Sequence, residues 1–166
     1  MSLPDPATQR TDPIVLGSGQ GRFVEIGSGS VCTFKVTGKS THGHFGLFEY
    51  TMKPHTAGPR PHIHKNMEEI FYVADGEVEL LVGDQRVTAR RGTIAVVPRG
   101  AAHAFSNPGA QTSVLHIMFC PADSREKYFE GLAELTKGGR TPDGQTLLAL
   151  MRAYDQEPVD KSQWTF

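Results

Sequence analysis

Between residues 14 and 121 the chain consists of short β-type segments, and this pattern limits the folds that it can adopt. Gly, Pro, Asn and Asp interrupt these segments, and several of them alternate apolar and polar side chains. Asp75-Gly76 and Gly83-Asp84 each join two consecutive segments, and such dipeptides favour tight hairpins because glycine tolerates positive φ. Many short strands at regular spacing indicate an antiparallel barrel or sandwich. We expect strands at Arg22–Ile26, Cys32–Thr37, Phe45–Met52, Glu69–Ala74, Glu77–Val82, Gln85–Ala89, Ile94–Val97, His103–Ser106 and Ser113–Phe119.

The regions on either side of these segments differ in composition. The N-terminal residues are rich in Pro, Asp and Thr, which predicts an extended or mobile arm. After the last segment, Asp123-Ser124-Arg125-Glu126 resembles a capping box, and a helix should follow it until Gly138-Gly139. Thr141-Pro142 predicts the cap and first turn of a second helix. The expected organisation is an arm at 1–13, one β-barrel at 14–121, and a helical extension at 122–166 packed on the outside of the barrel.

Charge, hydropathy and cysteine content argue against nucleic-acid or membrane partners and against a disulfide framework. The formal net charge is −1, which gives no electrostatic reason to expect nucleic acid or an anionic membrane. No apolar run is long enough to span a bilayer, and the first residues lack the apolar core of a signal peptide. Two cysteines, Cys32 and Cys120, are too few for a disulfide framework. We therefore expect a cytoplasmic protein with a small-molecule substrate and no nucleic-acid or membrane partner.

Four residues in the barrel region are candidate metal ligands. His62 and His64 are two residues apart, a spacing that puts both side chains on one face of a strand. Glu69 begins the next segment and His103 begins a later one, and these strands would be neighbours in an antiparallel barrel. Three nitrogens and one oxygen suit iron, nickel, manganese, copper or zinc. A His-x-His pair alone is weak evidence of a metal site, because exposed histidines are common.

The residues around His103 strengthen this hypothesis. From Gly92 to Asn107 the chain has the order G-x5-P-x-G-x2-H-x3-N. Gly92 permits the turn into the strand, while Pro98 and Gly100 predict a sharp turn that directs His103 inward. Asn107 can form hydrogen bonds with backbone groups where the strand ends.

This block, together with the order H-x-H-x4-E-x6-G from His62 to Gly76, resembles the paired motifs of the cupin superfamily. The second motif matches at every position, whereas in the first Gly58 precedes His62 by three intervening residues where five are usual. The resemblance implies an all-β cupin fold, a double-stranded β-helix or jelly-roll barrel, with a C-terminal α-helical extension. It also implies one divalent transition metal, with iron, nickel or manganese favoured over zinc or copper. The implied metal ligands are His62, His64, Glu69 and His103, with Glu68 pointing away.

A closer resemblance is to small single-domain bacterial cupins described as quercetin dioxygenase-like. It rests on the runs Glu-Ile-Phe-Tyr-Val from Glu69, Val-Pro-Arg-Gly-x-x-His-Ala-Phe from Val97 and Phe-Cys-Pro-Ala from Phe119. It implies a dioxygenase that acts on an aromatic or enolic small molecule, with Glu69 also as the catalytic acceptor of the substrate proton. The resemblance also implies a homodimer, because small cupins usually pair through their sheets. The alternatives are a non-oxidative cupin, such as a polyketide cyclase or isomerase, and a small-molecule-binding cupin without turnover.

Alternation suggests which side chains line a substrate cavity. Phe105 shares the face of His103, so we expect it to face the interior. Phe48 and Tyr50 share one face of the strand at Phe45–Met52, and His116 and Met118 share one face of the strand at Ser113–Phe119. Alternation leaves open whether these faces point inward. An aromatic and methionine lining would suit a flat apolar substrate, although such side chains can also simply fill a small barrel. The expected substrate-binding residues are Phe105, Phe48, Tyr50, His116 and Met118.

Overall fold

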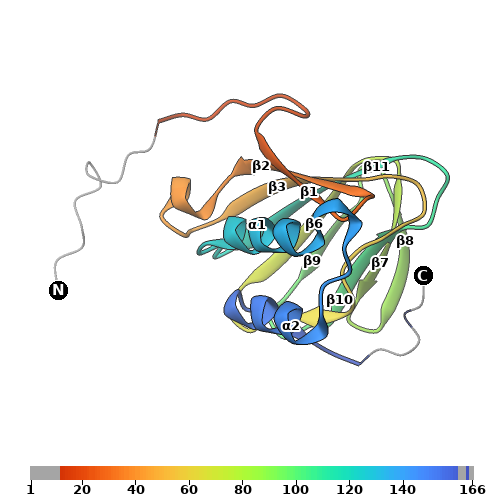
Figure 1. Cartoon of the computed structure of the whole chain (residues 1–166). Coiled ribbons are helices and arrows are strands. Elements are labelled where there is room, and N and C mark those ends of the chain that lie inside the picture. Colours follow the sequence, from red (N-terminus) through yellow and green to blue (C-terminus); the bar gives the residue numbers. More distant parts are fainter. Residues whose placement is uncertain (1–11, 161–163, 165–166) are drawn as a thin grey trace.

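Two six-stranded antiparallel sheets face each other in the computed structural model, which describes residues 12–160 and residue 164 (Figure 1). The first sheet has the order β1 (Arg22–Ile26), β2 (Ser30–Val36), β3 (Gly46–Met52), β11 (Ser113–Cys120), β6 (Glu68–Asp75) and β9 (Ile94–Val97). The second has the order β12 (Glu157–Pro158), β5 (His62–Ile63), β10 (His103–Asn107), β7 (Glu77–Val82) and β8 (Gln85–Arg90), with β4 (Thr56–Ala57) also paired to β10. The expected all-β jelly-roll architecture is confirmed.

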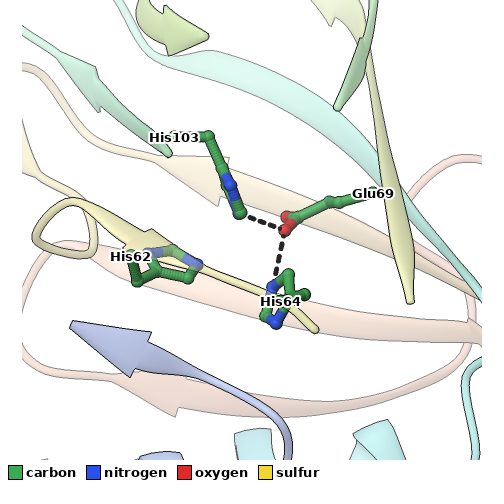
Figure 2. Close-up of side chains that lie close together, drawn as sticks. All are labelled: His62, His64, Glu69 and His103. Carbon is green, nitrogen blue, oxygen red and sulfur yellow. Dashed lines mark hydrogen bonds and ion pairs between the residues drawn. The ribbon is translucent and has the colours of Figure 1, made fainter. Parts of the chain in front are cut away.

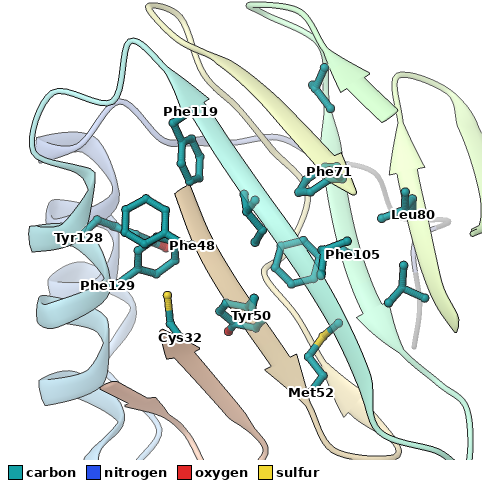
Figure 3. Close-up of a cluster of buried hydrophobic side chains, with 14 of the residues drawn as sticks. Cys32, Phe48, Tyr50, Met52, Phe71, Leu80, Phe105, Phe119, Tyr128 and Phe129 are labelled. Carbon is teal, nitrogen blue, oxygen red and sulfur yellow. The ribbon is translucent and has the colours of Figure 1, made fainter. Parts of the chain in front are cut away.

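Alternation along the strands places one apolar face of each sheet in a shared core (Figure 3). In β11, Leu115, Ile117 and Phe119 are buried, while the residues between them are only partly buried. Aromatic rings fill much of this core, and Phe48 lies within 6 Å, between ring centroids, of Phe34, Phe119 and Phe129. Burial of such side chains is the main driving force for the fold.

Turn chemistry explains one hairpin and corrects the expectation of another. Gly83-Asp84 forms a two-residue loop between β7 and β8, in which Val82 pairs with Gln85 and Gly83 has φ +62°. The expected hairpin at Asp75-Gly76 is wrong, because β6 is already paired on both sides, with β11 and β9, and β7 belongs to the other sheet. Gly76 has φ +71°, and a Cβ there would lie 2.7 Å from the Thr112 carbonyl oxygen. The glycine therefore turns the chain between sheets.

The helical extension contributes to the core and does not merely cover the barrel. It consists of α1 (Arg125–Thr136), a 3₁₀ turn at Lys137–Gly139 and α2 (Gly144–Ala153). Tyr128 and Phe129 of α1 pack into the same cluster as Phe48 (Figure 3). A further 3₁₀ turn at Gly38–Thr41 was not expected from the sequence.

Both predicted helix caps are corrected by the structure. Ser124 makes no side-chain cap on α1, and the Glu126 carboxylate instead accepts hydrogen bonds from the backbone N–H groups of Gly38 and Lys39, at 3.0 and 3.4 Å. These contacts tie α1 to the loop before β3. The cap of α2 is Asp143 and not Thr141, because Asp143 Oδ1 accepts a hydrogen bond of 2.9 Å from the Thr146 N–H.

Residues 17–20, which precede β1, lie against the first sheet. The expected arm at residues 1–13 falls outside the described residues except at positions 12 and 13. Lys35 Nζ donates to the carbonyls of Gly17 and Gln20 at 2.7 and 2.8 Å, and the Gly19 N–H donates to Glu49 Oε1 at 2.8 Å. Lys35 and Glu49 also form a buried ion pair of 3.4 Å, so this pair holds residues 17–20 against the sheet.

Asn107 fixes the end of β10, as its position in the motif predicts. Its Nδ2 donates to the carbonyls of Met52, Lys53 and Gln111, and its Oδ1 accepts from the Gly109 N–H. We expect Asn107→Ala to lower the free energy of unfolding by about 1–3 kcal/mol, because it leaves buried carbonyls without donors. Urea unfolding measures this change. Asn107→Asp keeps the acceptor but loses the donor, so an unchanged stability in that variant would contradict the role of Nδ2.

Candidate metal centre

Four buried side chains converge from both sheets onto one point (Figure 2). His62 lies in β5, His64 follows it, His103 begins β10, and Glu69 enters from β6 of the opposite sheet. One potential ligand atom from each residue lies within 4.8 Å of all the others. Each of the four side chains is at most 3% exposed. The structure therefore brings together all four residues that the sequence suggested as ligands.

Backbone contacts between the two motif blocks hold the histidines in register. His62 and His103 are directly paired across β5 and β10, and their ring centroids are 4.2 Å apart. Gly100 has φ +78°, and its N–H donates to the His64 carbonyl at 2.7 Å. The sharp turn predicted at Pro98 and Gly100 is thus confirmed, and it links the loop before His103 to His64.

Backbone carbonyls select the tautomer of each of the three candidate histidine ligands. Nδ1 of His62 is 2.8 Å from the Arg60 carbonyl oxygen, Nδ1 of His103 is 3.0 Å from that of Ala101, and Nδ1 of His64 contacts that of Asp155. A carbonyl oxygen can only accept, so Nδ1 carries the hydrogen in each ring. Each neutral imidazole therefore keeps its Nε2 lone pair for a ligand, as in metal-binding histidines.

The contacts at Glu69 call for a cation. Glu69 Oε2 lies 3.0 Å from His64 Nε2 and 2.7 Å from His103 Nε2. Neutral imidazoles would direct lone pairs at a carboxylate, which is repulsive, so a proton or a metal ion must lie between these atoms. Three imidazole nitrogens and one carboxylate oxygen fit a divalent transition metal. The four residues could hold one such ion, whose identity the donor set leaves open.

Burial and mutual interaction perturb the protonation of this cluster. Burial lowers the pKa of His62 well below its ordinary value, and His103 lowers it further. Burial acts to raise the pKa of Glu69, but the imidazoles of His103 and His64 outweigh it, so its pKa lies well below the usual range. A deprotonated carboxylate and a neutral imidazole are the forms that bind a metal ion.

These two shifts predict that the metal-free protein loses stability in acid. Below about pH 6.5 unfolded His62 takes up a proton that the folded protein does not bind, and Glu69 adds a second loss below about pH 4.3. The free energy of unfolding in chelator should therefore fall as the pH drops through these values. Urea unfolding at a series of pH values tests this, with His62→Gln expected to flatten the dependence near pH 6.5. A pH-independent stability would contradict it.

Aromatic side chains surround the candidate ligands. Phe71 is 6.0 Å from His103 and Phe119 is 5.8 Å from His64, measured between ring centroids. Phe105 contacts both Phe71 and Tyr50, at 5.6 and 5.3 Å. Of the expected substrate-binding residues, Phe105, Phe48 and Tyr50 face the interior, and their contact with a substrate stays a prediction.

The expected roles of His116 and Met118 as substrate contacts are corrected by the structure. The buried residues of β11 are its odd-numbered ones, so His116 and Met118 project from the outer face. There His116 pairs with Tyr72 in β6, and its Nε2 lies 3.4 Å from Glu49. Side chains on this face cannot contact a substrate held between the sheets.

The structure also distinguishes the two adjacent acids. Glu69 is buried in the cluster, whereas Glu68 is half-buried and forms an ion pair of 2.9 Å with Arg99. Sequence reasoning missed Asp155, whose carbonyl orients His64 from 91 residues away. No spacing pattern marks such a contact.

Comparison with known proteins agrees with this geometry. Residues 48–119 match the family described as "Cupin domain". An uncharacterized protein of Streptomyces coelicolor is 30% identical over 69 residues, which are 42% of this chain; the chain spans 62% of that relative's length.

Solved structures share the fold. A predicted oxalate decarboxylase from Thermotoga maritima has a TM-score of 0.60 and 16% identity, covering 65% of this chain and 99% of that chain. An RmlC-like cupin from Shewanella frigidimarina has a TM-score of 0.58 and 18% identity, covering 72% and 98%. At these identities the likeness concerns the fold alone.

The fold and the converging side chains define a jelly-roll β protein with a candidate mononuclear metal centre. Residues 48–119 match the cupin domain family, and the chain has the cupin fold. No helix among the described residues is long and apolar enough to cross a membrane.

Proposed function

We propose that this protein is a metal-dependent dioxygenase that resembles quercetin dioxygenase and acts on an aromatic or enolic small molecule. One divalent transition metal ion would be held by His62, His64, Glu69 and His103. The observation that carries the proposal is the set of three imidazoles with Nδ1 fixed by backbone carbonyls and Nε2 left for the ion. Such anchoring commonly accompanies histidines that bind metals.

The residues around the centre support a role in binding and proton transfer. The bound ion would supply Lewis acidity to a substrate hydroxyl. Both imidazole contacts of Glu69 use Oε2, so we assign Oε1 as the acceptor of the substrate proton. The rings of Phe71, Phe105 and Tyr50 would exclude water and pack against a flat apolar substrate.

Dioxygen consumption tests the oxidative reaction. Protein loaded in turn with iron, nickel or manganese is mixed with a panel of flavonols and other polyphenols, and dissolved dioxygen is followed with an electrode. We expect uptake with at least one substrate, and none with His103→Ala. The proposed dioxygenase function would be wrong if no substrate of the panel caused uptake and the same preparation converted a polyketide or a sugar without dioxygen. The protein would then be a cyclase or an isomerase.

We also propose that the protein forms a homodimer through the outer face of the first sheet. Ile94 and Val96 are 64% and 58% exposed there, and their register places them beside Tyr72 and Ile70 of β6. The segment before β1 adds Ile14, Val15 and Leu16, which are also exposed. A patch of this kind marks an interaction surface, and a net charge of −1 hardly opposes the approach of a second copy.

Light scattering after size-exclusion chromatography measures the oligomeric state. We expect a dimer for the wild-type protein and a monomer for Ile94→Lys. Val87→Lys is the matched control, because Val87 is an exposed apolar residue of β8 in the other sheet. A wild-type monomer, or loss of the dimer in the control alone, would overturn the proposed interface.

A further inference from the structure

The chain after α2 returns to the strand that carries His62. Strand β12 pairs with β5, so that Glu157 lies opposite Ile63 and Pro158 opposite His62. The Val159 N–H donates to the Pro61 carbonyl at 3.0 Å. Because β12 is the outermost strand of the second sheet, the C-terminal segment at residues 154–159 forms the edge beside the candidate metal centre.

Asp155 makes two kinds of contact in this segment. Its backbone carbonyl accepts the hydrogen bond from His64 Nδ1. Its carboxylate accepts from the backbone N–H groups of Lys65 and Asn66, at 3.1 and 2.8 Å, and from Asn66 Nδ2 at 2.9 Å. One residue thus binds both a candidate ligand and the turn that follows it. Asp155 has φ +55°, a conformation that aspartate adopts more readily than most residues.

Buried contacts hold this segment from the other side. The Gln156 side chain is 2% exposed, and its Oε1 accepts a hydrogen bond of 2.6 Å from Arg125 Nη2. Arg125 Nη1 donates to the Tyr154 carbonyl at 2.9 Å. The guanidinium carbon lies 4.6 Å from the centroid of Phe119, the ring that contacts His64. These contacts fix the backbone on both sides of Asp155.

The three histidines differ in where their Nδ1 partners come from. His62 and His103 use carbonyls two residues earlier in the chain, those of Arg60 and Ala101, so their orientation is set locally. His64 uses a carbonyl 91 residues away. The partner that orients its ring therefore belongs to residues 154–159.

We propose that Asp155 is a positioning residue for the metal centre, and that metal binding and docking of residues 154–159 are coupled. The inference rests on the proposed metal centre, but it does not depend on which reaction the centre performs. Coupling is reciprocal: the docked segment raises the affinity for the metal ion, and the bound ion stabilises the docked segment. Loss of an outer partner of a ligating histidine typically costs 10–100-fold in metal affinity.

Cobalt(II) binding by the full-length protein tests the positioning role without turnover. The affinity and the visible absorption of bound cobalt are compared for the wild type, Asp155→Ala and Asp155→Asn, the last of which keeps the shape of the side chain if alanine prevents folding. Both variants keep the Asp155 carbonyl, so affinity falls as far as the segment undocks: by up to about 100-fold in Asp155→Ala and by less in Asp155→Asn, whose Oδ1 still accepts, with altered absorption bands in both. Glu134→Gln is the matched control, because this exposed carboxylate of α1 pairs with Lys137 and Arg140 and lies outside residues 154–159. Its affinity should stay within about twofold.

Hydrogen exchange tests whether the bound ion stabilises the docked segment. Cobalt should slow exchange of the Gln156 and Val159 amides, which donate to Met151 and Pro61. Wild-type affinity and absorption in every Asp155 variant that folds, or equal exchange with and without cobalt, would overturn the inference and leave the metal centre standing. Absence of cobalt binding by the wild type would overturn both. Failure of dioxygen uptake would contradict neither the metal centre nor the positioning role of Asp155.

Discussion

Replacing His103 with alanine is expected to abolish tight metal binding and to destabilise the metal-free protein. The variant removes one of the four candidate ligands, so affinity should fall by more than the roughly 100-fold that an outer partner contributes. Without metal, the 2.7 Å contact between His103 Nε2 and Glu69 Oε2 is also lost, in a site at most 3% exposed. Removing one partner of a buried ionic pair costs about 3–5 kcal/mol. Equilibrium dialysis measures the first effect, and urea unfolding in chelator measures the second.

Glu69→Gln separates these two effects. It removes the anionic ligand, so metal affinity should fall as it does for His103→Ala. It also removes the buried charge that needs a partner, so the metal-free protein should lose much less stability. Wild-type metal affinity in either variant, or equal destabilisation by both in chelator, would contradict the arrangement described for the centre.

Replacing Gly58 with alanine is expected to disrupt the fold near the centre. A Cβ at Gly58 would lie 2.0 Å from the carbonyl oxygen of Phe105 and 2.9 Å from its Cδ2. Phe105 is buried in β10, two residues after His103, so relief of the clash requires a shift of the loop at Gly58 or of the strand that carries His103. We expect a loss of more than about 4 kcal/mol, in the range that marks severe steric or packing defects.

Gly144→Ala provides the matched control for this substitution. A Cβ there meets nothing within 4 Å, and Gly144 begins α2, where alanine is the better helix former. Its stability should match or slightly exceed that of the wild type. Thermal and urea unfolding of both variants tests the prediction, and wild-type stability in Gly58→Ala would contradict the close approach of this loop to β10.

Local patterns in the sequence were sufficient to predict most of the sheet structure. Alternation and turn residues predicted β1, β7 and β9 with the observed bounds, and other long strands within one or two residues. The two-residue strands β4, β5 and β12 have no periodicity to detect. In β11 both faces carry apolar residues, so alternation could not distinguish the face of His116 from that of Ile117. The burial of β6 between two neighbours, which excludes a hairpin at Gly76, depends on the whole topology.

The candidate centre was predictable because its residues lie in two short blocks with recognisable spacing. Each block contains a glycine that shapes the loop beside a histidine, and Gly58 and Gly100 both do so here. The support of His64 by Asp155 could not be predicted, since it depends on a return of the chain after α2. The choice of substrate is likewise absent from the motifs, because the aromatic side chains near the centre also serve as core.

Metal content tests directly whether the protein binds a metal ion through His62, His64, Glu69 and His103. Elemental analysis of protein purified without added metal or an affinity tag that binds metal, and again after incubation with iron, nickel or manganese and desalting, gives the stoichiometry. We expect about one transition metal ion per chain in the wild type and almost none in His62→Ala. The same low content in both proteins after incubation would contradict this expectation.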